Sequence, residues 1–421
     1  MIQTFELSPG ITLRCFQDFR FKQGCLSVQL VRPMKQEEAA MNALIPAVLL
    51  RGTEQYRDLR NITLRLDDLY GASVSALVRR IGDYQTTGLY CAFMEDRFAL
   101  AGDEIFSPMV DFLRQLLLEP LTEDGGFCRE FVESEKRNLI LTIESELNDK
   151  RVYAAGRLLR TMCSGDSFGI PRLGEKAQAQ AIDAKNIYRH YRKILEESAV
   201  SLFYVGSAQP EQVAALLTPL FTGISRNYIP LPSQTPFQDG GGSHLTEQMD
   251  VTQAKLGMGF VTPITNQMPE FAAMQVCNTL FGGGMTSKLF MNLREKMSLC
   301  YSIHSGYYGS KGILTVNAGI DAEKEETARQ EILRQLEQCC QGHITQQELH
   351  SAKEALLSSL RGVHDSPGAI EGYYGTHCLS AFPLTLPQHF DAINAVTAQQ
   401  VSSAARSLSL HSSYVLKGVS A

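Results

Sequence analysis

The sequence predicts an α+β protein of two homologous domains, each a mostly antiparallel sheet with helices packed on one face. Three observations lead to this fold class. The chain has 421 residues, too many for one ordinary core and suited to two domains of roughly 200 residues each. Similar segments recur in the same order in both halves. Strands also follow one another as hairpins, without strict alternation with helices.

The two halves open in the same way. Two segments have the alternating residue pattern of a strand and end in proline, which indicates strands at 25–33 (CLSVQLVRP) and 255–263 (KLGMGFVTP). A short polar turn follows each strand, and then an apolar helix that contains AAMN at 39–42 and AAMQ at 272–275. This repeated order favours a duplication.

Hairpins, long helices and a closing strand complete each half. The predicted hairpins pair 72–80 with 87–94 and 301–307 with 312–320. The string LRQL recurs at 113–116 and 333–336, each time within a long amphipathic helix. The next predicted helix runs from 127 to about 149 in the first half and is opened by a capping box at 345–348 in the second. Strands at 201–208 and 414–421 close the two halves.

The domain boundaries follow from the repeat. Residues 1–221 form the predicted first domain and residues 249–421 the second. Residues 222–248 carry prolines and a GGG run without periodicity, so they form the predicted linker.

Composition narrows the class of protein. Hydrophobic residues make up 44% and charged residues 20%, and the net charge is −6, so neither nucleic acid nor a membrane surface is an expected partner. The first ten residues lack a basic and an apolar region, and no apolar run is long enough to cross a bilayer. Ten cysteines without a C-x-x-C pair indicate free thiols in a reducing compartment. We therefore expect a cytoplasmic protein.

The most specific stretch runs from 281 to 302, FGGGMTSKLFMNLREKMSLCYS. Gly282, Gly283 and Gly284 leave the backbone free to visit positive φ and let another chain approach closely, so they predict a loop rather than a helix interior. A helix is expected from 286 to 298, followed by a strand at 299–303. Arg294 and Tyr301 then face one site, where a guanidinium binds a carbonyl or carboxylate and a phenol donates to a developing oxyanion. Taken alone, however, such residues more often belong to an ordinary loop and a solvated surface.

The whole string resembles the glycine-rich loop and R-E-K-x-x-L-x-Y signature of the insulinase/pitrilysin-like zinc metallopeptidases, in their second homologous domain. The resemblance extends over nearly the whole chain, including residues 190–213. It implies two α+β domains in a clamshell around a chamber. It also implies catalytic roles for Arg294 and Tyr301 and substrate binding by the three glycines.

The first half departs from the family at the zinc site. Active members carry H-x-x-E-H in the helix before a K-G-T-like turn. Here the turn is RGT at 51–53, and the five preceding positions of the motif read ALIPA. Ala43, Pro46 and Ala47 thus occupy degenerate zinc-motif positions, and Pro46 is expected to kink the helix. The first histidine of the chain is His190.

No other set of residues restores the missing zinc ligands. Leu141 and Thr142 stand where the family has acidic residues, and a shifted alignment would reach only Glu144 or Glu146. His343 and His350 flank Glu348 across a helix cap, a spacing typical of a solvated surface. We therefore predict no metal and no other cofactor.

These observations predict a metallopeptidase homologue that is inactive alone. In two-component relatives, one subunit supplies the zinc helix and a degenerate partner supplies the arginine, the tyrosine and the glycine loop. The expected partners are a zinc-bearing homologous peptidase subunit and a peptide or unfolded-segment substrate. The resemblance is closest to a degenerate bacterial subgroup associated with aminopentanol modification of elongation factor P. The alternative is a non-catalytic scaffold or peptide-binding protein built on the same clamshell.

Overall fold

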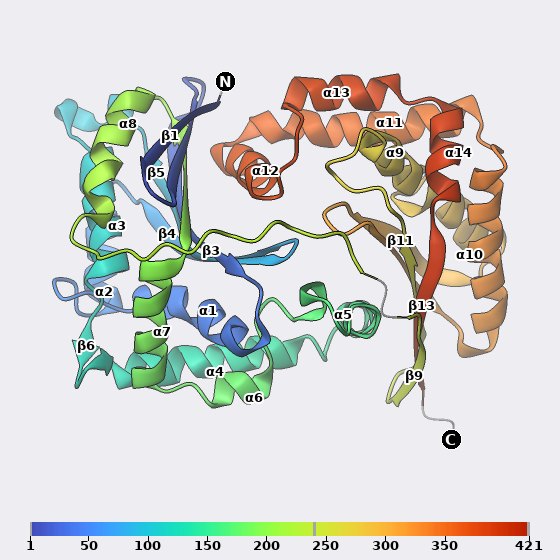
Figure 1. Cartoon of the computed structure of the whole chain (residues 1–421), viewed down its shortest axis with the longest axis horizontal. Coiled ribbons are helices and arrows are strands. Elements are labelled where there is room, and N and C mark those ends of the chain that lie inside the picture. Colours follow the sequence, from blue (N-terminus) through green and yellow to red (C-terminus); the bar gives the residue numbers. More distant parts are fainter. Residues whose placement is uncertain (1, 239–240, 419–421) are drawn as a thin grey trace. The chain divides into compact units, whose positions relative to one another are not determined.

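The computed structural model describes residues 2–238 and 241–418 and divides into two compact units (Figure 1). Unit 1 comprises the described residues of Met1–Glu144, Ile170–Ser233 and Val363–Leu379. Unit 2 comprises those of Ser145–Gly169, Gln234–Gly362 and Ser380–Ala421. Each unit therefore contains a segment from the other half of the sequence.

Unit 1 is built on a six-stranded sheet in the order β1-β2-β8-β3-β5-β4. Its strands are β1 (Ile2–Ser8), β2 (Ile11–Gln17), β3 (Gln23–Pro33), β4 (Ser73–Ile81), β5 (Tyr84–Met94) and β8 (Ala199–Gly206). All neighbours pair antiparallel except β2 and β8, which are parallel. The predicted hairpin of β4 and β5 is confirmed, whereas β1 and β2 were not predicted.

The main core of unit 1 lies between one face of this sheet and the helices that follow its strands. These helices are α1 (Gln36–Leu49), α2 (Leu59–Asp68), α3 (Phe106–Leu118), α4 (Arg129–Ser145), α6 (Lys176–Gln180), α7 (Ala184–Glu197) and α8 (Pro210–Leu217). The short strands β6 (Thr122–Glu123) and β7 (Gly126–Phe127) pair with each other. The helix expected from 127 to about 149 ends at Ser145.

One helix covers the other face of the unit 1 sheet, and it comes from the second half of the chain. α12 (Pro367–Leu379) contacts β3 and β8, and its Ile370 is buried in an apolar cluster with Phe16 and Phe203. The fully buried carboxylate of Glu371 accepts hydrogen bonds from Ser27 Oγ at 2.8 Å and from Arg79 Nη2 at 2.7 Å. This charged contact, as well as apolar burial, holds α12 on the sheet.

Unit 2 is built on a five-stranded sheet in the order β11-β12-β10-β13-β9. Its strands are β9 (His244–Met249), β10 (Ala254–Val261), β11 (Cys300–Tyr308), β12 (Ile313–Ile320) and β13 (Ser409–Gly418). Only β13 and β9 pair in parallel. β9 is formed by the last residues of the predicted linker. The predicted closing strand at 414–421 is described as far as residue 418, and the remainder lies outside the described residues.

Five helices cover the core face of this sheet: α9 (Phe271–Gly282), α10 (Glu325–Cys340), α11 (Gln346–Arg361), α13 (Leu386–Ala395) and α14 (Ala398–Arg406). The observed layers confirm the predicted α+β class with mostly antiparallel sheets. No helix among residues 2–238 and 241–418 is long and apolar enough to cross a membrane.

The opposite face of the unit 2 sheet is covered by α5 (Lys150–Met162), a helix from the first half of the chain. Figure 1 shows this green helix beside the yellow and red strands of unit 2. Gly257 and Gly259 lack side chains where Leu158 and Met162 approach the sheet. Each unit thus takes one helix from the other half of the sequence. The domain boundaries at 221 and 249 remain a prediction about the sequence repeat.

Candidate functional site

The degenerate zinc-motif positions lie on α1, and none of them has a side chain able to bind a metal. Ala43 and Pro46 are buried, and the helix runs through Pro46 to Leu49. Proline cannot donate to the carbonyl four residues earlier, which belongs to Asn42. Thr87 Oγ1 donates to that carbonyl at 2.6 Å instead. The helix therefore continues past Pro46, and the kink that we expected there stays a prediction.

A hydrogen-bonded network beside α1 uses the polar side chains of this region. Asn42 is buried, and its Nδ2 donates to Gln85 Oε1 at 2.9 Å. His190 Nε2 lies 2.7 Å from Asn42 Oδ1, and because that oxygen accepts, Nε2 carries the proton. Burial lowers the pKa of His190 to about 4, so the imidazole is neutral near pH 7. The first histidine of the chain is thus a packed structural group.

The downstream positions also do not fit a zinc ion. Leu141 is 63% exposed, and Thr142 Oγ1 donates to the Asn138 carbonyl at 2.8 Å. Glu144 is paired with Lys176, and Glu146 lies 3.8 Å from Arg160. Within the described ranges there is no group of three or more His, Cys, Asp or Glu that could hold a metal.

Glu348, the carboxylate between His343 and His350, has other partners. It accepts from the buried Lys288 Nζ at 2.7 Å and completes the capping box with Thr345. The predicted capping box is confirmed. The Glu348 carboxylate, which a metal would need, therefore already joins Lys288 to α11.

The three glycines allow close packing rather than positive φ. None of them lies among the positive-φ residues, so they do not use that conformational freedom. Gly282 is the last residue of α9, so the predicted loop begins only after it. A Cβ at Gly282 would lie 2.7 Å from Ser305 Oγ, and one at Gly283 would lie 2.7 Å from the Thr279 Cα. Gly282 therefore lets α9 end against β11. Gly284 is exposed with open space around it, and substrate binding by the three glycines stays a prediction.

The helix that carries Arg294 is a π-helix from Phe290 to Lys296. The Met297 N–H donates to the Asn292 carbonyl at 3.0 Å, and Ser298, at φ 50°, ends the segment. The expected helix is present, but its wider turn could not be predicted from apolar spacing. Single π-turns are rare and are frequent at functional sites.

Tyr301 owes its position to a β-bulge. β11 pairs with β12 through Cys300 opposite Ile320 and Ser302 opposite Gly319, so Tyr301 is the unpaired extra residue. Cys300 and Ile303 are buried in the core, whereas Tyr301 is 65% exposed. The bulge therefore turns the phenol away from the core, to the side on which Ser302 also lies.

Arg294 lies close to this bulge but has its own surroundings. Its guanidinium carbon is 4.7 Å from the centre of the Phe290 ring, and its Nε is 3.7 Å from Glu295 Oε1. Burial raises the pKa of Cys300 to about 11, and the charge of Arg294 partly opposes that rise. Arg294 thus lies near the residue before Tyr301, but it does not line the pocket described next.

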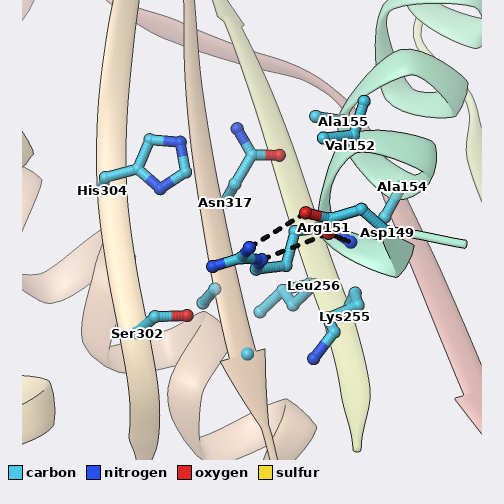
Figure 2. A pocket seen from close by; sticks show the side chains of 12 residues that line it. Asp149, Arg151, Val152, Ala154, Ala155, Lys255, Leu256, Ser302, His304 and Asn317 are labelled. Carbon is cyan, nitrogen blue, oxygen red and sulfur yellow. Dashed lines mark hydrogen bonds and ion pairs between the residues drawn. The ribbon is translucent and has the colours of Figure 1, made fainter. Parts of the chain in front are cut away.

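A pocket lies between the start of α5 and the sheet of unit 2 (Figure 2). It has an inner cavity of about 300 Å³ and an outer region of about 950 Å³. The inner cavity is lined by Asp149, Arg151, Val152, Ala154, Ala155, Lys255, Leu256, Ser302, His304, Asn317, Ala318 and Gly319. Tyr301 lines the outer region, which shares Asp149, Arg151, Lys255 and Ser302 with the inner one. The phenol therefore stands at the mouth of a connected pocket.

The pocket has a positive character. Asp149 caps α5 and accepts from Arg151 Nη2 at 2.9 Å, and these hydrogen bonds lower the pKa of Asp149 to about 2. Burial, and then the charge of Arg151, lower the pKa values of both Lys255 and His304. Neither His304 nor Asn317 has a side-chain hydrogen-bond partner within residues 2–238 and 241–418. The pocket thus combines two cations with free neutral polar groups.

Sequence reasoning missed these pocket residues. Lys255 and His304 belong to strands that we predicted correctly, and the polar alternation of those strands was the available signal. Polar alternation predicts that one face of a strand is exposed. It cannot show that α5, from the first half of the chain, covers part of that face and leaves a cavity there.

The fold and the site together define a peptidase-like protein without donor side chains at its zinc-motif positions. Residues 181–356 match the Peptidase M16 inactive domain. The probable inactive metalloprotease YmfF of Bacillus subtilis is 27% identical over 409 residues, which are 97% of this chain and 96% of that protein. Both findings confirm the resemblance to insulinase/pitrilysin-like peptidases.

Two solved structures agree with this assignment. A conserved protein from Enterococcus faecalis V583 superposes with a TM-score of 0.93 and 26% identity, covering 99% of both chains. A peptidase M16 inactive domain from Pseudomonas fluorescens has a TM-score of 0.82 at 16% identity and covers 100% of this chain and 98% of its own. The second likeness supports the fold alone. The comparisons as a whole support a non-catalytic role within the family.

Proposed function

We propose that this chain is the zinc-less subunit of a cytoplasmic heteromeric metallopeptidase. A homologous partner with an intact H-x-x-E-H motif would supply the zinc. This chain would supply substrate binding and transition-state stabilisation. The observation that carries the proposal is Tyr301, placed by a bulge at the mouth of a polar pocket, in a protein whose zinc-motif positions are apolar.

The edge position of β11 supports binding of an extended peptide. β11 is the outermost strand on its side of the unit 2 sheet, and a peptide gains main-chain hydrogen bonds by adding to such an edge. A peptide beside β11 would pass the bulge at Tyr301. Its phenol would then donate a hydrogen bond to the oxygen of the scissile carbonyl, which would gain negative charge during hydrolysis. The zinc of the partner would supply the activation of water.

Arg294 would act on the same peptide at a neighbouring carbonyl. The guanidinium is about half exposed, and within residues 2–238 and 241–418 its only ion-pair neighbour is the adjacent Glu295, at 3.7 Å. It therefore retains free donors for a carbonyl or carboxylate group. Such a contact fixes the register of the substrate more than it stabilises the transition state.

The test begins with assembly. We expect this chain, co-expressed with a homologue from the same genome that keeps H-x-x-E-H, to elute as a mixed complex in size-exclusion chromatography. The complex should cleave quenched fluorescent casein, and this chain alone should not. Recovery of two separate monomers, with the homologue fully active alone, would refute the proposal.

The role of each side chain is tested in the mixed complex. Tyr301→Phe should lower kcat by on the order of 10²- to 10³-fold with little change in KM, because one oxyanion donor is lost. Arg294→Ala should raise KM as well. Arg60→Ala, which removes an exposed arginine of unit 1, is the matched control and should leave both constants unchanged.

One observation favours the alternative, a scaffold or peptide-binding protein. Arg294 does not line the pocket at which Tyr301 stands. Under that alternative, peptides bind to this chain, but Tyr301→Phe and Arg294→Ala leave the activity of any complex unchanged. The kinetic comparison therefore separates the two functions.

A further inference from the structure

We propose that the pocket of unit 2 selects peptides by binding a carboxylate, either of an acidic side chain or of a free C-terminus. This inference rests on the proposed function, because the peptide is the one held at Tyr301. It adds the chemical class of substrate. Four features of the pocket support it: its connection to Tyr301, its charge, its unused donors and its hollow floor.

The inner cavity shares Asp149, Arg151, Lys255 and Ser302 with the outer region, which Tyr301 lines. At about 300 Å³ it lies at the lower end of ligand-pocket volumes, enough for one or two side chains of a peptide. A peptide main chain at Tyr301 would therefore direct a side chain or its own end into the cavity.

The charges of the pocket do not cancel. Asp149 is the only acidic residue of the inner lining, and it is engaged with Arg151 and with the first turn of α5. Lys255 Nζ donates to Gln253 Oε1, a neutral amide, and no carboxylate lies within ion-pair distance of it in the described chain. Burial, and then the charge of Arg151, lower the pKa of Lys255, and the charge of Asp149 opposes this shift. An anionic group of a ligand would give Lys255 the carboxylate partner that it lacks.

Two neutral donors stand directly opposite each other on neighbouring strands. His304 of β11 and Asn317 of β12 are cross-strand partners, so their side chains lie on the same face a few ångströms apart. Figure 2 shows the two side chains beside each other on neighbouring strands of the pocket that Arg151 also lines. Because neither has a partner of its own, an incoming carboxylate would accept hydrogen bonds without displacing an existing one.

Gly319 forms part of the lining of the cavity. In the register of the sheet, Gly319 of β12 lies between Ser302 of β11 and Lys255 of β10. A Cβ at this position would lie 2.9 Å from Gln253 Oε1 and 3.2 Å from Ser302 Oγ. The methyl groups of Ala154 and Ala155 from α5 add apolar lining. A short methylene stem ending in a carboxylate matches this combination of apolar walls and cationic donors.

Other ligand classes fit less well. A cationic side chain would oppose Arg151 and Lys255. An apolar side chain would fill the cavity but would cover the ammonium of Lys255 and the donors of His304 and Asn317 without replacing their water, which costs free energy. A carboxylate alone satisfies both the charge and the donors.

The experiment measures binding of dye-labelled alanine-based octapeptides to the purified full chain by fluorescence anisotropy. Four probes combine a central Glu or Gln with a free or amidated C-terminus. The probe with the preferred carboxylate should bind on the order of tenfold to a hundredfold more tightly than its neutral counterpart, the range expected for a charge-assisted hydrogen bond. The central pair and the terminal pair report separately on side-chain and C-terminal carboxylates.

Variants then locate the effect. Lys255→Met and Asn317→Ala should each reduce the preference for the carboxylate, and Gly319→Ala should weaken all carboxylate probes by narrowing the cavity. Lys353→Met, which removes a lysine of unit 2 outside the pocket that donates to the Asn394 carbonyl, is the matched control and should leave the preference intact. Tyr301→Phe should also leave it intact.

Each contrary result has a distinct meaning. Equal binding of all four probes, or a preference unaffected by Lys255→Met, overturns the carboxylate site while peptide binding at Tyr301 stands. Absence of binding by every probe, both to the chain alone and to the mixed complex, overturns the carboxylate site and the proposed function together.

Discussion

The neighbourhood of α1 in unit 1 and the pocket of unit 2 differ in how their polar groups are used. Beside α1, the side chains of Asn42, Gln85 and Thr87 all have partners within the protein. In the pocket, His304 and Asn317 have none within the described chain. The degenerate zinc-motif positions belong to a packed interior, whereas the pocket of unit 2 has polar side chains that are available to a ligand.

This difference predicts different consequences of substitution. A hydrogen bond buried in the interior contributes to folding, because its partner would otherwise lose water without compensation. A solvated side chain in a pocket contributes little to folding and is available to a ligand. Substitutions beside α1 should therefore change stability, and substitutions in the pocket should change binding.

The largest expected effect is that of Asn42→Ala. Removing the amide leaves Gln85 Oε1 and His190 Nε2–H without partners, and two such orphaned groups cost about 4 kcal/mol of unfolding free energy. Urea denaturation measures the loss. The matched variant in the pocket, Asn317→Ala, should change the unfolding free energy by no more than about 0.5 kcal/mol. Similar losses in both variants would remove the contrast between the two regions.

The second largest expected effect is a loss of unfolding free energy on acidification, through His190 beside α1. Folding lowers the pKa of His190 from 6.5 to about 4, so the unfolded chain binds more protons between these values. The contribution of the neutral imidazole is fully present above about pH 6.5 and is lost as the pH falls toward 4, by up to about 3 kcal/mol. Unfolding midpoints of the His190→Gln variant should depend less on pH in this window. An equally steep dependence would show that another group titrates.

Thr87→Val should cost about 2 kcal/mol, because the carbonyl of Asn42 loses its donor inside the core. The variant Pro46→Ala provides a sharper test, since alanine restores a backbone N–H at the position that normally serves this carbonyl. In a double-mutant cycle, Pro46→Ala should recover much of the stability lost in Thr87→Val. Simple additivity of the two changes would contradict the proposed replacement of the helix bond.

The smallest expected effect is on metal content. Elemental analysis of the triple variant Ala43→His, Pro46→Glu, Ala47→His should find no stoichiometric zinc. Leu141 and Thr142 offer no carboxylate as a further ligand. Zinc sites also need neighbouring groups that hydrogen-bond to the ligands and orient them, and the three substitutions do not supply these groups. The wild-type chain is the reference. About one zinc per chain in the triple variant would mean that the first half still holds a usable ligand set.

Local chemistry explains what the sequence determined. Alternation with period two indicated β3 and β10, because side-chain direction along a strand depends only on neighbouring residues. The loss of the zinc motif followed from residue identity alone, since Ala43 and Ala47 have no donor atoms in any fold.

Tertiary structure alone decided where these pieces meet. The covering of the unit 2 sheet by α5 and of the unit 1 sheet by α12 depends on pairings between distant segments, which composition and period do not encode. The bulge at Tyr301 depends on the register with β12, because one unpaired residue changes which side chains face the core. The pocket arises from the same register, which places Gly319 between Ser302 and Lys255 and leaves space that no single strand could predict.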